Sequence, residues 1–180
     1  MLSSSDREAI IALIKREVVP AIGCTEPVAV SLCVARATEL LGAKPDSVSV
    51  RLSANILKNA MGVGIPGTGM IGLPIAIALG VLVGRSEYGL EVLKDADVQA
   101  VEAGRRFIEE KRISVQLKEG ITEKLYIEVT VTASGHYAEA IISGGHTTFV
   151  YMRRDDEVLL DERKPSSEQA NVQDVELTLQ

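Results

Sequence analysis

Residues 124–132, which read KLYIEVTVT, alternate polar and apolar side chains along their whole length. Successive side chains of a β-strand point to opposite faces of a sheet, so Leu125, Ile127, Val129 and Val131 would share one face. An alternation of this kind is typical of a strand with one buried and one solvent-facing side. The stretch therefore predicts an amphipathic strand and points to a sheet in this part of the chain.

The neighbouring segments have the same period of two. They are residues 113–117 (ISVQL), 137–142 (YAEAII) and 147–152 (TTFVYM). Turn residues separate the segments and predict hairpins; these are Gly120, Ser134, Gly135, Gly144 and Gly145. We expect residues 113–162 to form an antiparallel β-rich subdomain.

Before residue 112 the apolar residues recur mainly at helical spacing. Ser5-Asp-Arg-Glu8 is a capping box that opens the first helix, which we expect to end at Pro20. A helix of small residues follows, up to Leu41, and Gly42 suits its left-handed C-cap. Residues 70–83, 88–94 and 97–111 predict three further helical stretches, and residues 47–53 (SVSVRLS) a half-buried strand.

These patterns together predict an α+β fold. Its mainly helical region covers residues 1–112, its β-rich region covers residues 113–162, and residues 163–180 form a linker or the start of a further part.

Composition narrows the classes of function. The 180 residues include 19 basic and 25 acidic side chains, giving a formal charge of −6. This balance argues against binding to nucleic acid or to an anionic membrane, which requires clustered Lys and Arg. The N-terminus lacks the pattern of a secretory signal, and the apolar run at 70–83 is shorter than the roughly 20 residues that span a bilayer. We expect a cytoplasmic protein with reduced thiols.

The chain has two cysteines, too few for a disulfide framework or a four-cysteine metal site. Cys24 immediately precedes a predicted helix, where the positive end of the helix dipole favours a thiolate. It is a candidate nucleophile, base or metal ligand, although a small buried apolar residue is the commoner role of a free cysteine. Cys33 would lie roughly 13 Å further along the same helix, too far to share a metal or a disulfide with Cys24. We expect Cys33 in the core.

Two more segments carry polar or flexible groups. Residues 53–59 (SANILKN) offer a hydroxyl, two amides and an ammonium after a strand, which suits either ligand contact or an ordinary polar helix start. The glycine-rich residues 62–69 (GVGIPGTG) could hold an anion by main-chain N–H groups or allow tight packing. They match neither a P-loop nor a dinucleotide-binding fingerprint. His136 and His146 are interpreted as structural or surface residues, and nothing in the sequence supports an acid–base pair of Glu128 and Glu139.

In order, the motifs Gly23-Cys-Thr-Glu-Pro27, Ser53-Ala-Asn-Ile-Leu-Lys-Asn59 and Val63-Gly-Ile-Pro-Gly-Thr-Gly69 resemble the N-terminal half of the L-cysteine desulfidase family. That family is related to the iron–sulfur L-serine dehydratase alpha chain. The resemblance is strongest over residues 20–85. It implies a 4Fe-4S cluster that binds the leaving group of cysteine or serine, and a β-elimination of sulfide or water that ends in pyruvate and ammonia.

The resemblance also implies roles for single residues. Cys24 would serve as a base or as a displaceable cluster ligand. The residues implied to line the pocket and hold the substrate carboxylate are Ser53, Asn55, Lys58, Asn59, Pro66, Gly67 and Thr68. A cation with aligned main-chain donors is the usual solution for a carboxylate.

The chain departs from the family pattern in one respect: three further cysteines hold the cluster in the family, and this chain has none after Cys33. We therefore expect an N-terminal portion of a longer protein, inactive and without a cluster by itself, whose exposed apolar surface would allow it to form a homo-oligomer. Two alternatives stay open. One is a non-catalytic module that binds a small anion or an amino acid, and the other is an interaction domain.

Overall fold

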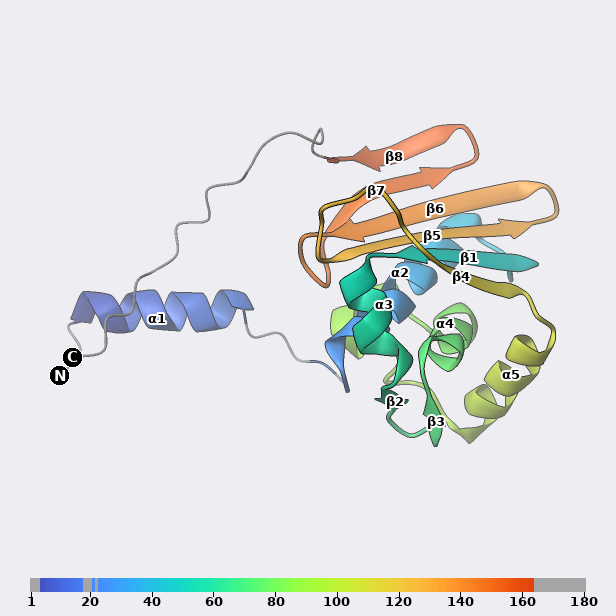
Figure 1. Cartoon of the computed structure of the whole chain (residues 1–180), viewed down its shortest axis with the longest axis horizontal. Helices are drawn as coiled ribbons and strands as arrows, with labels where there is room; N and C mark the ends of the chain where they lie inside the picture. The colour runs from blue at the N-terminus through green and yellow to red at the C-terminus, as the bar shows by residue number, and fades with distance from the viewer. Residues whose placement is uncertain (1–3, 18–20, 22, 164–180) are drawn as a thin grey trace.

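A computed structural model describes residues 4–17, 21 and 23–163 of the chain (Figure 1). The helices are α1 (Ser4–Glu17), α2 (Thr25–Leu41), α3 (Ala54–Met61), α4 (Leu73–Leu82) and α5 (Val98–Glu109), with a 3-10 helix η1 (Ser86–Glu91). The strands are β1 (Ser47–Leu52), β2 (Gly64–Ile65), β3 (Met70–Ile71), β4 (Ile113–Leu117), β5 (Tyr126–Ala133), β6 (His136–Ser143), β7 (Phe149–Arg154) and β8 (Glu157–Asp161). The architecture is α+β, which confirms the predicted fold class.

Six strands form one sheet in the order β4-β1-β5-β6-β7-β8. β1 comes from the mainly helical part of the sequence, yet it lies between β4 and β5, parallel to the former and antiparallel to the latter. The pairs from β5 to β8 are antiparallel hairpins. The segments before and after residue 112 therefore share one sheet and one hydrophobic core.

Helices cover one face of this sheet. α2 contacts β5, β6 and β7, while α4 contacts α2 and α5 (Figure 1). α4 is apolar on all sides and nearly all its residues are buried, as expected of a helix enclosed by other elements. Cys33 lies in this core on α2, with its Sγ donating to the Ala140 oxygen of β6 at 3.3 Å, and burial raises the pKa of its thiol. The expectation that Cys33 is a core residue is confirmed.

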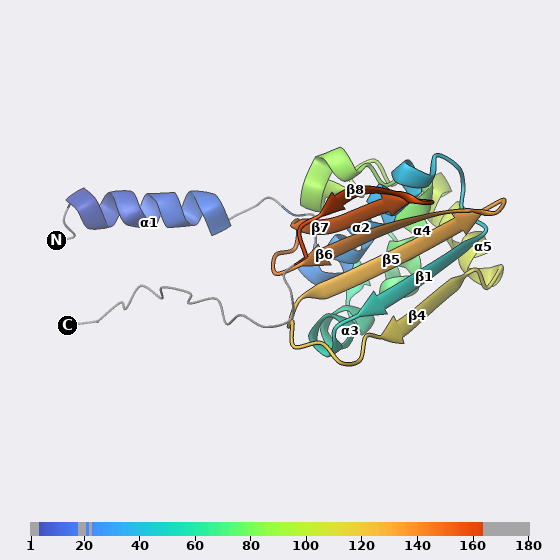
Figure 2. The same cartoon turned by 90° about the horizontal axis from the view of Figure 1, so that it is seen from above.

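The opposite face of the sheet carries a buried carboxylate. Figure 2 looks onto this face, with the strands in front of α2, α4 and α5. Glu128 of β5 is 4% exposed and accepts from Arg51 Nη1 (2.8 Å), Lys118 Nζ (2.6 Å) and Tyr126 Oη (2.7 Å). Long side chains from three parts of the chain thus cover the carboxylate, and they give this sheet face a compact polar layer.

The structure differs from the sequence prediction in four places. β8 was not among the predicted strands, because only three apolar residues stand between its acidic ends. Residues 70 and 71 belong to the hairpin β2–β3, so α4 begins at Leu73 rather than at residue 70. β4 pairs with β1 and not with β5, so Gly120 lies in a connection and not in a hairpin turn. Residues 88–94, expected to be helical, contain only the end of the short 3-10 helix η1.

The sequence also predicts that the apolar run at residues 70–83, which contains α4, is too short to span a membrane. None of the helices in the described ranges combines the length and apolarity needed to cross a bilayer. The expected helix end at Pro20 and the segment after Arg163 lie outside the described residues.

Candidate functional site

Cys24 occupies the N-cap of α2. Its backbone is extended (φ −70°, ψ 133°), and its side chain does not cap the helix. Gly23, just before it, has a φ of +96°, and a Cβ at this position would lie 2.9 Å from the ring of Pro66. Glycine is therefore required here both for the backbone conformation and for the close approach of the glycine-rich loop. The first and the third sequence motifs are in direct contact.

The thiol of Cys24 is hydrogen-bonded to a neighbouring carboxylate. Its Sγ donates to Glu26 Oε2 at 3.0 Å, and the Thr25 hydroxyl donates to the same oxygen at 3.2 Å. Partial burial raises the pKa of the Cys24 thiol, and the neighbouring Glu26 carboxylate raises it further. Burial and the Glu26 carboxylate thus oppose the stabilisation of a thiolate that was predicted for the helix N-terminus.

Glu26 is a site residue that sequence reasoning missed. The hydrogen bond from Cys24 lowers the pKa of the Glu26 carboxyl, and Thr25 and the nearby charge of His146 lower it further. His146 is half-buried in the β6–β7 connection, 120 residues further along the chain, and was interpreted as structural or surface. The spacing Cys-Thr-Glu at a helix start is the one signal that could have indicated Glu26.

The second motif begins at the N-cap of α3. Ser53 is buried, its Oγ donates to the Lys124 oxygen at 2.8 Å, and it accepts from the Tyr126 N–H at 3.3 Å. Its hydroxyl therefore links α3 to the start of β5. Asn55, Lys58 and Asn59 follow on α3, and all three are exposed. Their spacing of three and four residues places them on one side of the helix.

The third motif forms the hairpin β2–β3. The Thr68 hydroxyl is buried, donates to the Ile65 oxygen at 2.7 Å and accepts from the Met70 N–H at 2.9 Å. It closes the hairpin turn, so its hydrogen bonds are internal. Pro66 and Gly67, at the tip, are exposed, and Gly67 has a φ of +77°.

The second and third motifs also lie side by side. The Gly72 N–H donates to the Val63 oxygen at 2.8 Å, and a Cβ on Gly72 would lie 2.8 Å from the oxygen of Met61, the last residue of α3. The fold thus brings the start of α2, the hairpin and the end of α3 together. Five polar side chains of this group are at least partly exposed: those of Cys24, Glu26, Asn55, Lys58 and Asn59. The hydroxyls of Ser53 and Thr68, by contrast, hydrogen-bond to main-chain groups.

The donor set does not fit an iron–sulfur cluster. Cys24 supplies one accessible thiol, Cys33 is enclosed in the core, and no group of three or more His, Cys, Asp or Glu in the described ranges could hold a metal ion. The residues on this chain can bind a carboxylate, exchange a proton between sulfur and a carboxylate, and provide main-chain donors.

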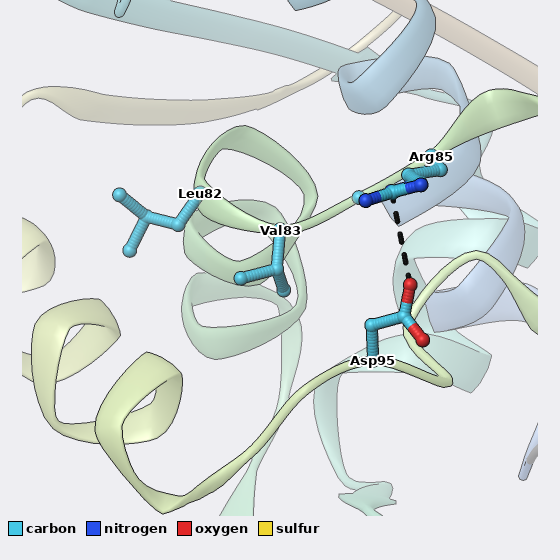
Figure 3. A pocket seen from close by; sticks show the side chains of 5 residues that line it. Leu82, Val83, Arg85 and Asp95 are labelled. Carbon is cyan, nitrogen blue, oxygen red and sulfur yellow. Dashed lines mark ion pairs between the residues drawn. The ribbon is translucent and has the colours of Figure 1, made fainter.

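A pocket lies at the other end of α4. It has a volume of about 330 Å³ and is lined by Leu82, Val83, Gly84, Arg85 and Asp95, with Arg85 and Asp95 forming an ion pair at 3.7 Å (Figure 3). A neighbouring pocket of about 400 Å³ shares Leu82 and Gly84. Neither includes a residue of the three motifs, which lie at the N-terminal end of α4.

Comparison with known proteins finds relatives among bacteria. The chain is 67% identical over 178 residues to a UPF0597 protein of Bacteroides fragilis and 63% identical over 175 residues to one of Bacteroides thetaiotaomicron. A UPF0597 protein of Porphyromonas gingivalis is 47% identical over 169 residues. The matches include 99%, 97% and 94% of this chain but only 42%, 41% and 39% of the respective relatives. The chain thus spans about two-fifths of the length of these relatives. No family model and no solved structure matches.

Proposed function

We propose that this chain is the N-terminal portion of a lyase that acts on cysteine or serine. In the proposed reaction one molecule of cysteine and one of water give pyruvate, ammonia and hydrogen sulfide, and serine gives pyruvate and ammonia after loss and return of water. The observation that carries the proposal is the contact of Gly23 with Pro66 beside the end of α3, which brings the three motifs to one place. Motifs that resemble one family and also meet in space support a shared site more strongly than their order alone.

Binding of the substrate carboxylate is assigned to α3 and the hairpin. Lys58 supplies a positive charge, Asn55 and Asn59 supply amide donors from the same helix side, and all three are exposed to an incoming molecule. The hairpin tip at Gly67 adds main-chain N–H groups. A cation with several N–H donors matches the charge and shape of a carboxylate.

Proton transfer is assigned to the pair of Cys24 and Glu26. The elimination removes a proton from the α-carbon, so a base must lie in the site. The resemblance implies Cys24 for this role, but its Sγ carries a proton and donates it toward Glu26 Oε2. Glu26, the group without the proton in this pair, is therefore assigned as the base, and Cys24, the group with it, as the acid.

The iron–sulfur cluster stays part of the proposal for the whole protein. It would stabilise the leaving group, and its protein ligands would have to come from outside this chain, which has two cysteines in total. The proposal also places the protein in the cytoplasm, where its thiols remain reduced.

The test uses a full-length chimera in which this chain replaces the matched part of the Bacteroides fragilis relative. The chimera is prepared without oxygen, and sulfide and pyruvate are measured with cysteine and with serine. We expect turnover of at least one substrate, its loss in Cys24→Ser and its retention in Cys33→Ala, the matched control. Amino-acid binding without turnover would instead support the non-catalytic binding module. The absence of both binding and turnover would refute the lyase proposal and the binding module alike.

A further inference from the structure

Two large apolar side chains are exposed beside the candidate site. Met61, at the end of α3, is 62% exposed, and Ile71, in β3, is 67% exposed. The Met61 oxygen lies 2.8 Å from the position of a Cβ on Gly72, the residue that follows Ile71. The two residues therefore lie on adjoining pieces of backbone, where α3 meets the hairpin (Figure 1).

The segment around them is almost without charge. Between Ala54 and Gly72, Lys58 is the only charged residue, although 24% of the whole chain is charged. Most of this segment is nevertheless at the surface, including Asn55, Asn59 and the hairpin tip. An exposed surface with apolar side chains and few charges has the composition of an interface core. We call it the α3–hairpin surface, made of the exposed residues of 54–72.

The candidate site also needs a cover. A bound small molecule usually has about 70–90% of its surface enclosed by protein. Asn55, Lys58 and Asn59 project from one helix side, and the two pockets described above lie at the far end of α4. A second wall is required to enclose an amino acid against these groups.

Other exposed apolar residues do not combine these properties. Val98 is 83% exposed but stands alone at the start of α5, next to Asp97. Val158 and Leu159 belong to the edge strand β8, whose ends are acidic. Ile11, Leu13 and Ile14 lie on the charged helix α1, and Leu117 at the end of β4 precedes Lys118. The α3–hairpin surface is distinguished by its lack of charge and by its contact with the site.

We propose that the α3–hairpin surface is the docking surface for the remaining part of the longer protein, the part that this chain does not match in its relatives. More than half of each relative lies outside the matched stretch, which is ample chain to form the missing wall. Docking there would cover Met61 and Ile71 and close the site over Lys58. The inference rests on the proposed function only in treating the three motifs as a site that needs covering.

Hydrogen–deuterium exchange tests the proposal without any activity measurement. The exchange of amides in residues 61–72 is compared between this chain alone and the full-length chimera with the Bacteroides fragilis relative. We expect exchange to slow by about tenfold or more in the chimera, because docking adds to the cost of opening the hairpin. Ile71→Asp should remove that slowing, and Val98→Asp, the matched exposed control, should leave it intact.

Equal exchange in the two proteins would overturn the proposal, as would slowing confined to β8 or to the open sheet face. If the chimera does not fold, the same comparison between the Bacteroides fragilis relative and its own matched stretch gives the answer. The result is independent of the lyase proposal: slowed exchange without turnover retains the docking surface, and turnover without slowed exchange rejects it.

Discussion

Replacing Glu128 by glutamine should destabilise the protein far more than the same change at Glu139. Both carboxylates lie on the open face of the sheet, on the adjacent strands β5 and β6. Glu128 is buried and its carboxylate receives three hydrogen bonds, two of them from cations, whereas the Glu139 side chain forms no hydrogen bond or ion pair within the described part of the chain. The two substitutions are isosteric, so they separate charge from packing.

The expected magnitude follows from the contacts. Removing one partner of a buried ion pair costs about 3–5 kcal/mol. Arg51 and Lys118 are partly exposed and regain some hydration, so we expect Glu128→Gln to lower the free energy of unfolding by about 2–3 kcal/mol at pH 7. Glu139→Gln should change it by less than about 0.5 kcal/mol or stabilise the protein slightly.

The two carboxyls also differ in their pH dependence. Burial alone would raise the pKa of Glu128, but the hydrogen bonds from Lys118, Tyr126 and Arg51 lower it below its ordinary 4.5. Its stabilising contribution is therefore present above pH 4.5 and is lost as the pH falls through the lower folded-state value. Burial and the charge of Glu128 raise the pKa of Glu139, so its ionisation opposes folding as the pH rises through its folded-state value.

Urea unfolding followed by circular dichroism measures both effects, since the chain has no tryptophan. The difference between wild type and Glu128→Gln should shrink between pH 7 and pH 3. Equal effects of the two substitutions at pH 7, or an effect of Glu128→Gln that is unchanged at pH 3, would refute the assigned role of the ion pairs.

Three further predictions concern the site and the core. Glu26→Gln should lower the pKa of the Cys24 thiol toward its ordinary 9.0, so that Cys24 is alkylated faster at pH 8. Mass spectrometry of the labelled peptide measures the rate of alkylation. An unchanged rate would contradict the thiol–carboxylate hydrogen bond. Gly72→Ala should lower the free energy of unfolding by about 1–3 kcal/mol, because φ is +89° and the new Cβ would meet a main-chain oxygen at 2.8 Å. Gly62→Ala, with φ −100° and open space, is its control and should be nearly neutral in the same urea titration. Phe107→Ala should cost about 3–5 kcal/mol, since this side chain is among the largest that are fully buried, and a loss below about 1 kcal/mol would show that α5 packs loosely.

Local patterns were sufficient for most of the elements. The period of two around residues 124–132 predicted β5, and the same signal predicted β1, β4 and parts of β6 and β7. Gly42 adopts the expected left-handed C-cap of α2, with φ 72°. These features depend on residues a few positions apart in the sequence, so a local pattern is enough to predict them.

The candidate site could be predicted only in part. The resemblance indicated Cys24 and the motifs at 53–59 and 63–69 as site residues, but it did not show which of their side chains form hydrogen bonds within the fold. Ser53 was expected to bind substrate, and in the structure its hydroxyl joins α3 to β5 through Lys124 and Tyr126. Those partners lie about 70 residues away, so no local pattern contains them.

The sequence by itself determined the α+β class, most elements and the core position of Cys33, because hydrophobic periodicity and turn residues act over short distances. Tertiary structure alone decided which strands are neighbours, with β1 between β4 and β5. It also shifted pKa values in the site, since burial raises the pKa of the Cys24 thiol and His146, far along the chain, contributes to lowering that of the Glu26 carboxyl. Electrostatic effects follow distances in space, and those distances exist only once the chain has folded.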